Sequence, residues 1–321
     1  MNSILLTGGA GFVGFHVANE LLKRGDKVII IDNFNSYYDP NLKKARIKQL
    51  KHHKNLKVYK ADISNYKVLS KIFQKHKFNK ICHLAAQAGV RYSLKAPFRY
   101  HKYNSLGTLN LLELARKYKI NDFVFASSSS VYGNNKTTPF KEIDNVDNPI
   151  SLYAATKKSN ELYAYAYHHL YKINCTGLRF FTVYGPWGRP DMAYFEFTNK
   201  ILKNQPIDVY NFGNLKRDFT YIGDIAPAIV KAIDNPFKYE IINLGNNKPV
   251  KLNQFIETIE NELKIKAKKN FLPMQKGDVH LTYADITKAK RLLNYEPKTN
   301  IEQGIKKFIT WYKQYYKIQW K

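Results

Sequence analysis

Cysteine is scarce in this sequence: Cys82 and Cys175 are the only two among 321 residues. Two thiols cannot form a disulfide framework, and these two lack the close spacing of a metal site. Each lies in an apolar run, so we expect both to be reduced thiols in the core. The sequence therefore excludes a disulfide-rich secreted domain, and we expect no metal ion.

Long hydrophobic runs are also missing. No stretch approaches the roughly 20 apolar residues that a membrane helix requires. The N-terminal segment reaches Gly8 and Gly9 too early to contain the apolar core of a signal peptide. We therefore expect a cytoplasmic protein that does not bind membranes.

Acidic side chains are few: the chain has 25 Asp and Glu but 52 Lys and Arg, which gives a formal charge of +27. Such an excess is compatible with an anionic partner, either nucleic acid or an acidic small molecule. The lysines are spread along the whole chain, which favours a general compositional bias over a nucleic-acid interface. Hydrophobic residues make up 44% of the chain, so wholesale disorder is excluded.

The first half of the chain alternates short apolar runs with helical patterns. Alternation of this kind predicts an α/β fold with a Rossmann-type, doubly wound parallel sheet. The strands are expected to be buried on both faces. The expected strands are Ile4–Leu6, Val28–Ile31, Val58–Tyr59, Ile81–Leu84, Phe123–Ala126 and Thr176–Leu178.

From about Val183 the pattern loosens and prolines separate shorter elements. We expect a dinucleotide-binding domain over residues 1–182. A smaller α/β substrate-binding domain over 183–321 would cover the carboxyl ends of the strands, where such sheets bind ligands. A late strand at Glu240–Leu244 is expected to rejoin the first sheet.

A glycine-rich turn, Thr7–Gly14, follows the first expected strand and opens the first helix. Glycines at these positions allow a tight turn and close approach of the backbone to a pyrophosphate. Asp32 ends the next strand, where a carboxylate can reach the adenosine ribose and repel a 2′-phosphate, which favours NAD over NADP. The cofactor contacts expected here are Gly8, Gly11, Phe12, Val13, Gly14, Asp32 and Asn33.

The chemistry is indicated by Tyr153 and Lys157, whose spacing places both side chains on one helix face. A free tyrosine has a pKa near 10, so it is a poor base at neutral pH. A neighbouring ammonium group and a positive nicotinamide both favour the phenolate. A hydroxyl from the run Ser127–Ser130, at the end of a strand, can hydrogen-bond the substrate oxygen that exchanges this proton.

Nearly the whole chain resembles the extended short-chain dehydrogenase/reductase superfamily, and within it the UDP-glucuronate 4-epimerases. The segments Asn-Ser-Tyr-Tyr-Asp (35–39) and Gly-Arg-Pro-Asp-Met (188–192) are the most specific. The other segments that carry the resemblance are Thr7–Gly14, His83–Ser93, Ser127–Gly133, Tyr153–Lys157, Arg179–Pro186 and Lys216–Ile222.

The resemblance implies roles for individual residues. Tyr153 would be the catalytic base, Lys157 would activate it and bind the nicotinamide ribose, and Ser128 would be the catalytic hydroxyl. NAD would take a hydride from sugar C4, and the 4-keto sugar would turn over and receive the hydride on its other face. Asn104 would hold the helix geometry behind the lysine. The further cofactor contacts implied are Asp62, Ile63, Ala85 and Ala86.

The residues before Val131-Tyr132-Gly133 decide between reaction types. Relatives that eliminate water carry a carboxylate there, whereas this chain has Ser129 and Ser130. The resemblance therefore favours an isomerase that inverts C4 without elimination, and polysaccharide biosynthesis as its setting. A non-catalytic nucleotide-sensing or nucleic-acid-binding protein on the same fold is the alternative class, and the Tyr153–Lys157 pair argues against it.

The sugar is expected to be a uronate, because hydroxyls of Ser129, Ser130 and Thr182, with Arg189, can hold a C5 carboxylate. The alternative substrates are UDP-N-acetylglucosamine and UDP-glucose. Arg91 either joins this cluster or faces the phosphates.

The resemblance also implies contacts with the uridine diphosphate from Arg217, Gln275 and Asp278, although a structural role fits Gln275 and Asp278 equally well. Gln275 and Lys276 stand where some epimerases have an arginine pair. The resemblance also implies a homodimer through the helices around Leu106–Ala115 and Tyr153–Leu170.

Overall fold

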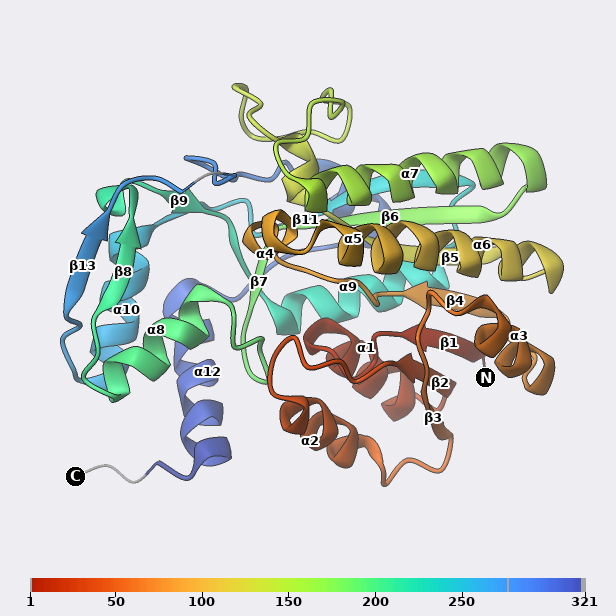
Figure 1. Cartoon of the computed structure of the whole chain (residues 1–321), viewed down its shortest axis with the longest axis horizontal. Coiled ribbons are helices and arrows are strands. Elements are labelled where there is room, and N and C mark those ends of the chain that lie inside the picture. The colour runs from red at the N-terminus through yellow and green to blue at the C-terminus, as the bar shows by residue number, and fades with distance from the viewer. Residues whose placement is uncertain (1, 276, 319–321) are drawn as a thin grey trace.

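The computed structural model describes residues 2–275 and 277–318. Its centre is a seven-stranded sheet in the order β11-β6-β5-β4-β1-β2-β3 (Figure 1). Every neighbouring pair in this sheet is parallel. The strands are β1 (Ser3–Thr7), β2 (Lys27–Asp32), β3 (Leu56–Lys60), β4 (Lys80–His83), β5 (Asp122–Ser128), β6 (Asn174–Phe180) and β11 (Tyr239–Leu244).

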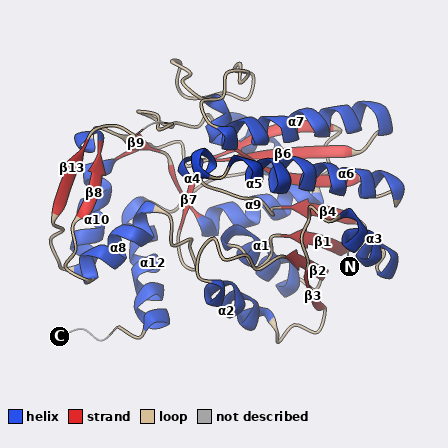
Figure 2. Cartoon of the chain, in the orientation of Figure 1, coloured by secondary structure: helices blue, strands red, loops and turns tan. Residues whose placement is uncertain are grey.

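Helices cover both faces of this sheet (Figure 2). Side chains alternate across a strand, so Ile4 and Leu6 pack on one face and Leu5 on the other. The first face is covered by α1 (Phe12–Lys23), α2 (Pro40–Leu50), α9 (Ile222–Asp234) and α11 (Thr287–Leu293). The second is covered by α3 (Tyr66–Lys75), α6 (Gly107–Lys117) and α7 (Leu152–Tyr171). The predicted doubly wound α/β fold is confirmed.

The edge strand β3 differs from expectation. Val58 and Tyr59 are only partly buried, and Lys57 and Lys60 are exposed. The prediction that this strand is buried on both faces was wrong, because β3 has a neighbour on one side only.

A smaller layered unit lies beside the sheet, at the left of Figure 1. Its core is rich in aromatic rings, including Phe219 and Phe255 stacked with centroids 4.2 Å apart. Its helices are α8 (Ala193–Leu202), α10 (Leu252–Leu263) and α12 (Ile301–Tyr316). Its strands pair as β7 (Thr182–Tyr184) with β10 (Phe219–Tyr221), β8 (Ile207–Tyr210) with β13 (Lys269–Leu272), and β9 (Lys216–Arg217) with β12 (Val250–Lys251).

The chain after residue 182 contributes to both cores, since α9, β11 and α11 pack with the large sheet. The division into domains at 182 and 183 stays a prediction. Within residues 2–275 and 277–318, no helix is both long and apolar enough to cross a bilayer.

Candidate active site

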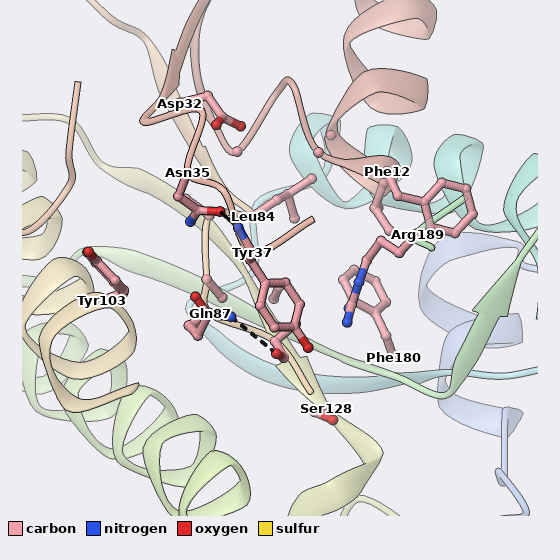
Figure 3. Close-up of a pocket in the computed structure, with 18 of the residues that line it drawn as sticks. Phe12, Asp32, Asn35, Tyr37, Leu84, Gln87, Tyr103, Ser128, Phe180 and Arg189 are labelled. Atoms are coloured by element: carbon pink, nitrogen blue, oxygen red, sulfur yellow. Dashed lines mark hydrogen bonds between the residues drawn. The ribbon is translucent and has the colours of Figure 1, made fainter. Parts of the chain in front are cut away.

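Two adjoining pockets open at the carboxyl ends of the central strands. The two pockets share a wall, and side chains from distant parts of the chain line both pockets there. In Figure 3, Asp32 lies at one end of the first pocket and Ser128 at the other, with Tyr37 and Arg189 between them. The residues that line both pockets are Tyr37, Ser128, Tyr153, Phe180, Phe181, Arg189 and Met192.

The glycine turn forms the floor of the first pocket. A Cβ on Gly14 would lie 2.2 Å from the carbonyl oxygen of Gly8, and a Cβ on Gly8 would lie 2.7 Å from the backbone nitrogen of Ala85. Gly8 also has a φ of +72°, which side-chain-bearing residues rarely adopt. The backbone is therefore packed as closely as only glycine permits, beside the start of α1, where free N–H groups favour a phosphate.

Asp32, at the end of β2, is held in place by its neighbours. Its carboxylate accepts hydrogen bonds from the backbone N–H groups of Ala10, at 3.2 Å, and Phe34, at 2.8 Å. Lys43 Nζ lies 3.5 Å from Asp32 Oδ1 and also donates to Asn35 Oδ1 at 3.3 Å. These partners fix the position of the Asp32 carboxylate at the edge of the pocket, where a ribose diol can donate to it.

Tyr153 and Lys157 lie in the first two turns of α7, whose N-terminus is capped by Ser151 Oγ accepting from the N–H of Ala154 at 3.1 Å. Lys157 Nζ donates to the carbonyl oxygen of Ala126 at 2.8 Å. Burial lowers the pKa of Lys157 to about 8, although Glu161 on the next turn opposes that shift. Burial also raises the pKa of the Tyr153 phenol, and a hydrogen bond with Ser128 and the charge of Arg189 act in the opposite direction.

The serine run leaves the end of β5 and continues as a 3₁₀ turn over Ser129–Tyr132. Ser128 Oγ accepts from the N–H of Ser130 at 3.2 Å and lies 3.0 Å from Ser130 Oγ. This local cap fixes the hydroxyls at the strand end, so Ser128 faces both pockets while Ser129 and Ser130 face the second.

The second pocket contains arginines that already have acidic partners. Arg189 forms a two-pronged ion pair with Asp191. Arg91 Nη2 lies 3.1 Å from Asp278 Oδ2, and its guanidinium lies 4.8 Å from the ring centre of Tyr210.

Most of the predicted site residues line one of these pockets. The first is lined by Gly8, Gly11, Phe12, Val13, Gly14, Asp32, Asn33, Ile63, Ala85, Ala86, Ser128, Tyr153, Lys157 and Arg189. The second is lined by Arg91, Ser128, Ser129, Ser130, Tyr153, Thr182, Arg189, Arg217 and Asp278.

Three predicted residues lie outside both sets of lining residues, so their proposed contacts stay predictions. Asp62 accepts from the N–H and hydroxyl of Ser64. Asn104, in the π-helical turn His101–Leu106, exchanges two hydrogen bonds with the backbone of Gln87 and donates to Thr156 Oγ1 at 3.0 Å. The carbonyl of Gln275 accepts from the N–H of Asp278, and Lys276 lies outside the described residues.

Sequence reasoning missed three residues that hold site groups in position: Lys43 beside Asp32, and Tyr37 and Asp191 beside Arg189. Tyr37 and Asp191 belong to the two most specific sequence segments, which was the available signal for them. Nothing in the spacing of Lys43 identified it.

Comparisons with known proteins agree with this geometry. The family model described as GDP-mannose 4,6 dehydratase matches residues 5–308. A UDP-glucuronate 4-epimerase of Thermodesulfobacterium geofontis is 47% identical over 315 residues, covering 98% of this chain and 97% of the relative.

Solved structures are similar over the same length. The UDP-glucuronic acid 4-epimerase of Bacillus cereus, in complex with UDP-glucuronic acid and NAD, has a TM-score of 0.92 and 35% identity, covering 98% of this chain and all of that one. The UDP-glucose 4-epimerase of Thermotoga maritima, with UDP-glucose, has a TM-score of 0.89 and 32% identity, covering 98% of this chain and 99% of that one. The chain therefore belongs to the GDP-mannose 4,6-dehydratase family of extended short-chain dehydrogenase/reductases, together with the UDP-glucuronate 4-epimerases that it resembles.

Proposed function

We propose that this protein is an NAD-dependent UDP-sugar 4-epimerase and that its substrate is UDP-glucuronate, which it converts to UDP-galacturonate. The observation that carries the proposal is the position of Tyr153 and Ser128 on the wall shared by two pockets. A base at that wall can reach a sugar in one pocket and a dinucleotide in the other. The similarity to UDP-glucuronate 4-epimerases supports UDP-glucuronate as the substrate.

The first pocket fits a nicotinamide dinucleotide on this chain's own features. The glycine turn leaves no room for side chains where a pyrophosphate would approach, and Asp32 lines the end of the pocket where a ribose would lie. The bound dinucleotide supplies a reversible hydride acceptor. The first pocket, lined mostly by residues before 183, would hold it. The second pocket, lined about equally by residues before and after 182, would hold the UDP-sugar.

Tyr153 takes the proton from the sugar 4-hydroxyl and later returns it. Ser128 hydrogen-bonds the same oxygen, so the proton moves along a short, fixed path. The hydrogen bond with Ser128 and the guanidinium of Arg189 favour the phenolate against the penalty of burial. An ammonium on Lys157, one turn along the same helix, would act in the same direction. Ser129 and Ser130 carry hydroxyl groups, so these two positions provide no carboxylic acid that could catalyse loss of water.

Ser129, Ser130 and Thr182 also provide the hydroxyls for a sugar carboxylate in the second pocket. Holding that carboxylate matters because a 4-keto uronate is a β-keto acid, which loses CO₂ readily when its carboxylate can rotate. UDP-glucose or UDP-N-acetylglucosamine is the second candidate. The ion pair between Arg189 and Asp191 favours it, because a paired arginine does not require an anionic sugar.

A cytoplasmic homodimer is part of the proposal. Large hydrophobic side chains are exposed along the predicted dimer helices, at Leu106, Leu162, Tyr165 and Leu170, which supports pairing through this face. Sedimentation of the purified protein tests it, and a monomer at micromolar concentration would contradict it.

The decisive experiment incubates the purified protein with UDP-glucuronate, UDP-glucose and UDP-N-acetylglucosamine in parallel and identifies the products by NMR. We expect UDP-galacturonate from the first, without net consumption of NAD. Conversion of only a neutral sugar would establish the second candidate, and unchanged spectra for all three would refute an epimerase.

A further inference from the structure

Arg189 reaches the shared wall with its charge already balanced. Its Nε donates to Asp191 Oδ1 at 3.0 Å and its Nη2 to Asp191 Oδ2 at 2.5 Å. Both side chains are largely shielded, at 22% and 27% exposure. One complete edge of the guanidinium is therefore occupied by a carboxylate that belongs to the protein.

Tyr37 holds this carboxylate from a different part of the chain. Its hydroxyl donates to Asp191 Oδ2 at 3.1 Å, and its ring lies beside Arg189 in the middle of the pocket (Figure 3). Burial and the nearby charge of Asp191 raise the pKa of Tyr37 to about 12, so the phenol stays protonated and keeps donating. Asp191 is thus fixed between a cation and a hydroxyl.

We propose that Asp191 is an internal counter-anion to Arg189 and sets how strongly the enzyme discriminates between UDP-uronates and neutral UDP-sugars. This inference rests on the proposed function. A sugar carboxylate that approaches Arg189 meets a guanidinium whose Nε–Nη2 edge is taken, and it is repelled by a second carboxylate nearby. A neutral sugar meets neither effect, so Asp191 weakens uronate binding selectively.

Weaker binding of the uronate carboxylate is useful in the proposed mechanism. The hydroxyls of Ser129, Ser130 and Thr182 would hold the carboxylate against loss of CO₂. The 4-keto sugar must also turn over before the hydride returns, so the carboxylate must be released and then bound again. An unpaired arginine would bind the carboxylate in one orientation and slow that rotation. The pair leaves Nη1 of Arg189 available for hydrogen bonding and adds no net charge.

A purely structural role for Asp191 predicts a different result. If Asp191 only oriented Arg189, its removal would weaken the binding of charged and neutral sugars alike. The ratio of the two affinities therefore separates the two roles, whereas loss of activity alone does not.

The experiment measures dissociation constants of UDP-glucuronate, UDP-glucose and UDP by calorimetry, and kcat and KM for both sugars. In Asp191→Asn we expect the affinity ratio of UDP-glucuronate to UDP-glucose to rise about tenfold, as for a close charge pair at a binding site. The affinity for UDP should not change, and kcat for UDP-glucuronate should fall. Asp147→Asn is the matched control, because it makes the same change in a carboxylate that lies 3.3 Å from Lys158 Nζ, is 67% exposed and lines neither pocket. Its ratio should stay within about twofold of the native one.

An unchanged or reduced ratio in Asp191→Asn overturns the inference. Asp191→Ser removes the same charge with a smaller side chain and serves as the test if Asp191→Asn does not fold, as judged by circular dichroism. Measurements on the native protein distinguish failure of the proposed function from failure of the role of Asp191. If it neither binds nor converts UDP-glucuronate, the proposed function fails, whereas normal conversion with an unchanged ratio in the variants defeats only the role of Asp191.

Discussion

Arg179 and Glu161 form a buried ion pair at α7, the helix that carries Tyr153 and Lys157. Arg179 Nε donates to Glu161 Oε1 at 2.9 Å, and Nη2 donates to Oε2 at 2.8 Å. Both side chains are only 3% exposed. Ser127 Oγ adds a third hydrogen bond to Glu161 at 2.6 Å. Since Glu161 is one turn beyond Lys157, the ion pair joins α7 to β6 and the bond from Ser127 joins it to β5.

Removing the charge of Glu161 is expected to destabilise the protein strongly. Glu161→Gln leaves the guanidinium of Arg179 buried without its counter-ion, which costs about 3–5 kcal/mol. Urea unfolding followed by circular dichroism measures the loss. Glu296→Gln is the matched control, because its pair with Lys298 is 4.0 Å long and exposed, and such pairs contribute about 0–1 kcal/mol. Equal losses in the two variants would contradict this account.

Local spacing was enough to predict the strands of the sheet, the glycine turn and the placing of Tyr153 and Lys157 on one helix, because each pattern lies within a short stretch of sequence. The catalytic role of this pair stays a prediction. The contacts that hold the site together could not be predicted from local spacing, since they join segments that are far apart in the sequence. Arg46 is fully buried and donates to the carbonyl oxygens of Ala10, Trp187 and Gly188. Nothing in a helical lysine- and arginine-rich segment distinguishes such a residue from a solvated neighbour.

The ion pairs in the second pocket show the same limit. The sequence indicated Arg189 and Arg91 as groups for an anionic ligand, but not that Asp191 and Asp278 already pair with them. Charge balance within a pocket depends on side chains that only the folded chain brings together. The exposure of β3 likewise follows from strand order, which apolar runs do not encode.

Replacing the phenol of Tyr153 tests the catalytic assignment. Tyr153→Phe keeps the ring and its packing but cannot accept the substrate proton, so we expect kcat to fall by about 10²–10⁴. Binding of NAD and of UDP should be retained, which calorimetry checks. Tyr165→Phe is the control on the same helix, since Tyr165 is 54% exposed and lines neither pocket. Full activity in Tyr153→Phe would refute Tyr153 as the base.

Acid should destabilise the protein through His83. Its Nδ1 lies 2.7 Å from Thr7 Oγ1 and its Nε2 lies 3.0 Å from Thr108 Oγ1. Burial lowers the pKa of His83 from 6.5 to about 3. The unfolded chain therefore binds a proton below pH 6.5 that the folded chain excludes, so the contribution of His83 to stability is lost as the pH falls from 6.5 toward 3.

His83 alone should reduce the free energy of unfolding by about 2 kcal/mol between pH 6.5 and about pH 4.5. Urea unfolding at several pH values, compared between the native protein and His83→Gln, measures the effect. The variant starts from a lower stability but should show a shallower slope with pH. Identical slopes would mean that His83 does not stay neutral in the folded protein.

The close packing of backbone atoms in the glycine turn predicts that Gly14→Ala loses dinucleotide binding. The new Cβ would lie 2.2 Å from the carbonyl oxygen of Gly8, and that oxygen also accepts the N–H of Gly11 at 2.9 Å. The turn must open to admit it, so we expect loss of dinucleotide binding and a lower free energy of unfolding, measured by calorimetry and urea unfolding. Gly25→Ala is the control, because its Cβ meets nothing within 4 Å while its φ of +96° strains the backbone. That control should cost about 1–3 kcal/mol and keep dinucleotide binding, and unimpaired binding in Gly14→Ala would show that this turn does not form the pyrophosphate site.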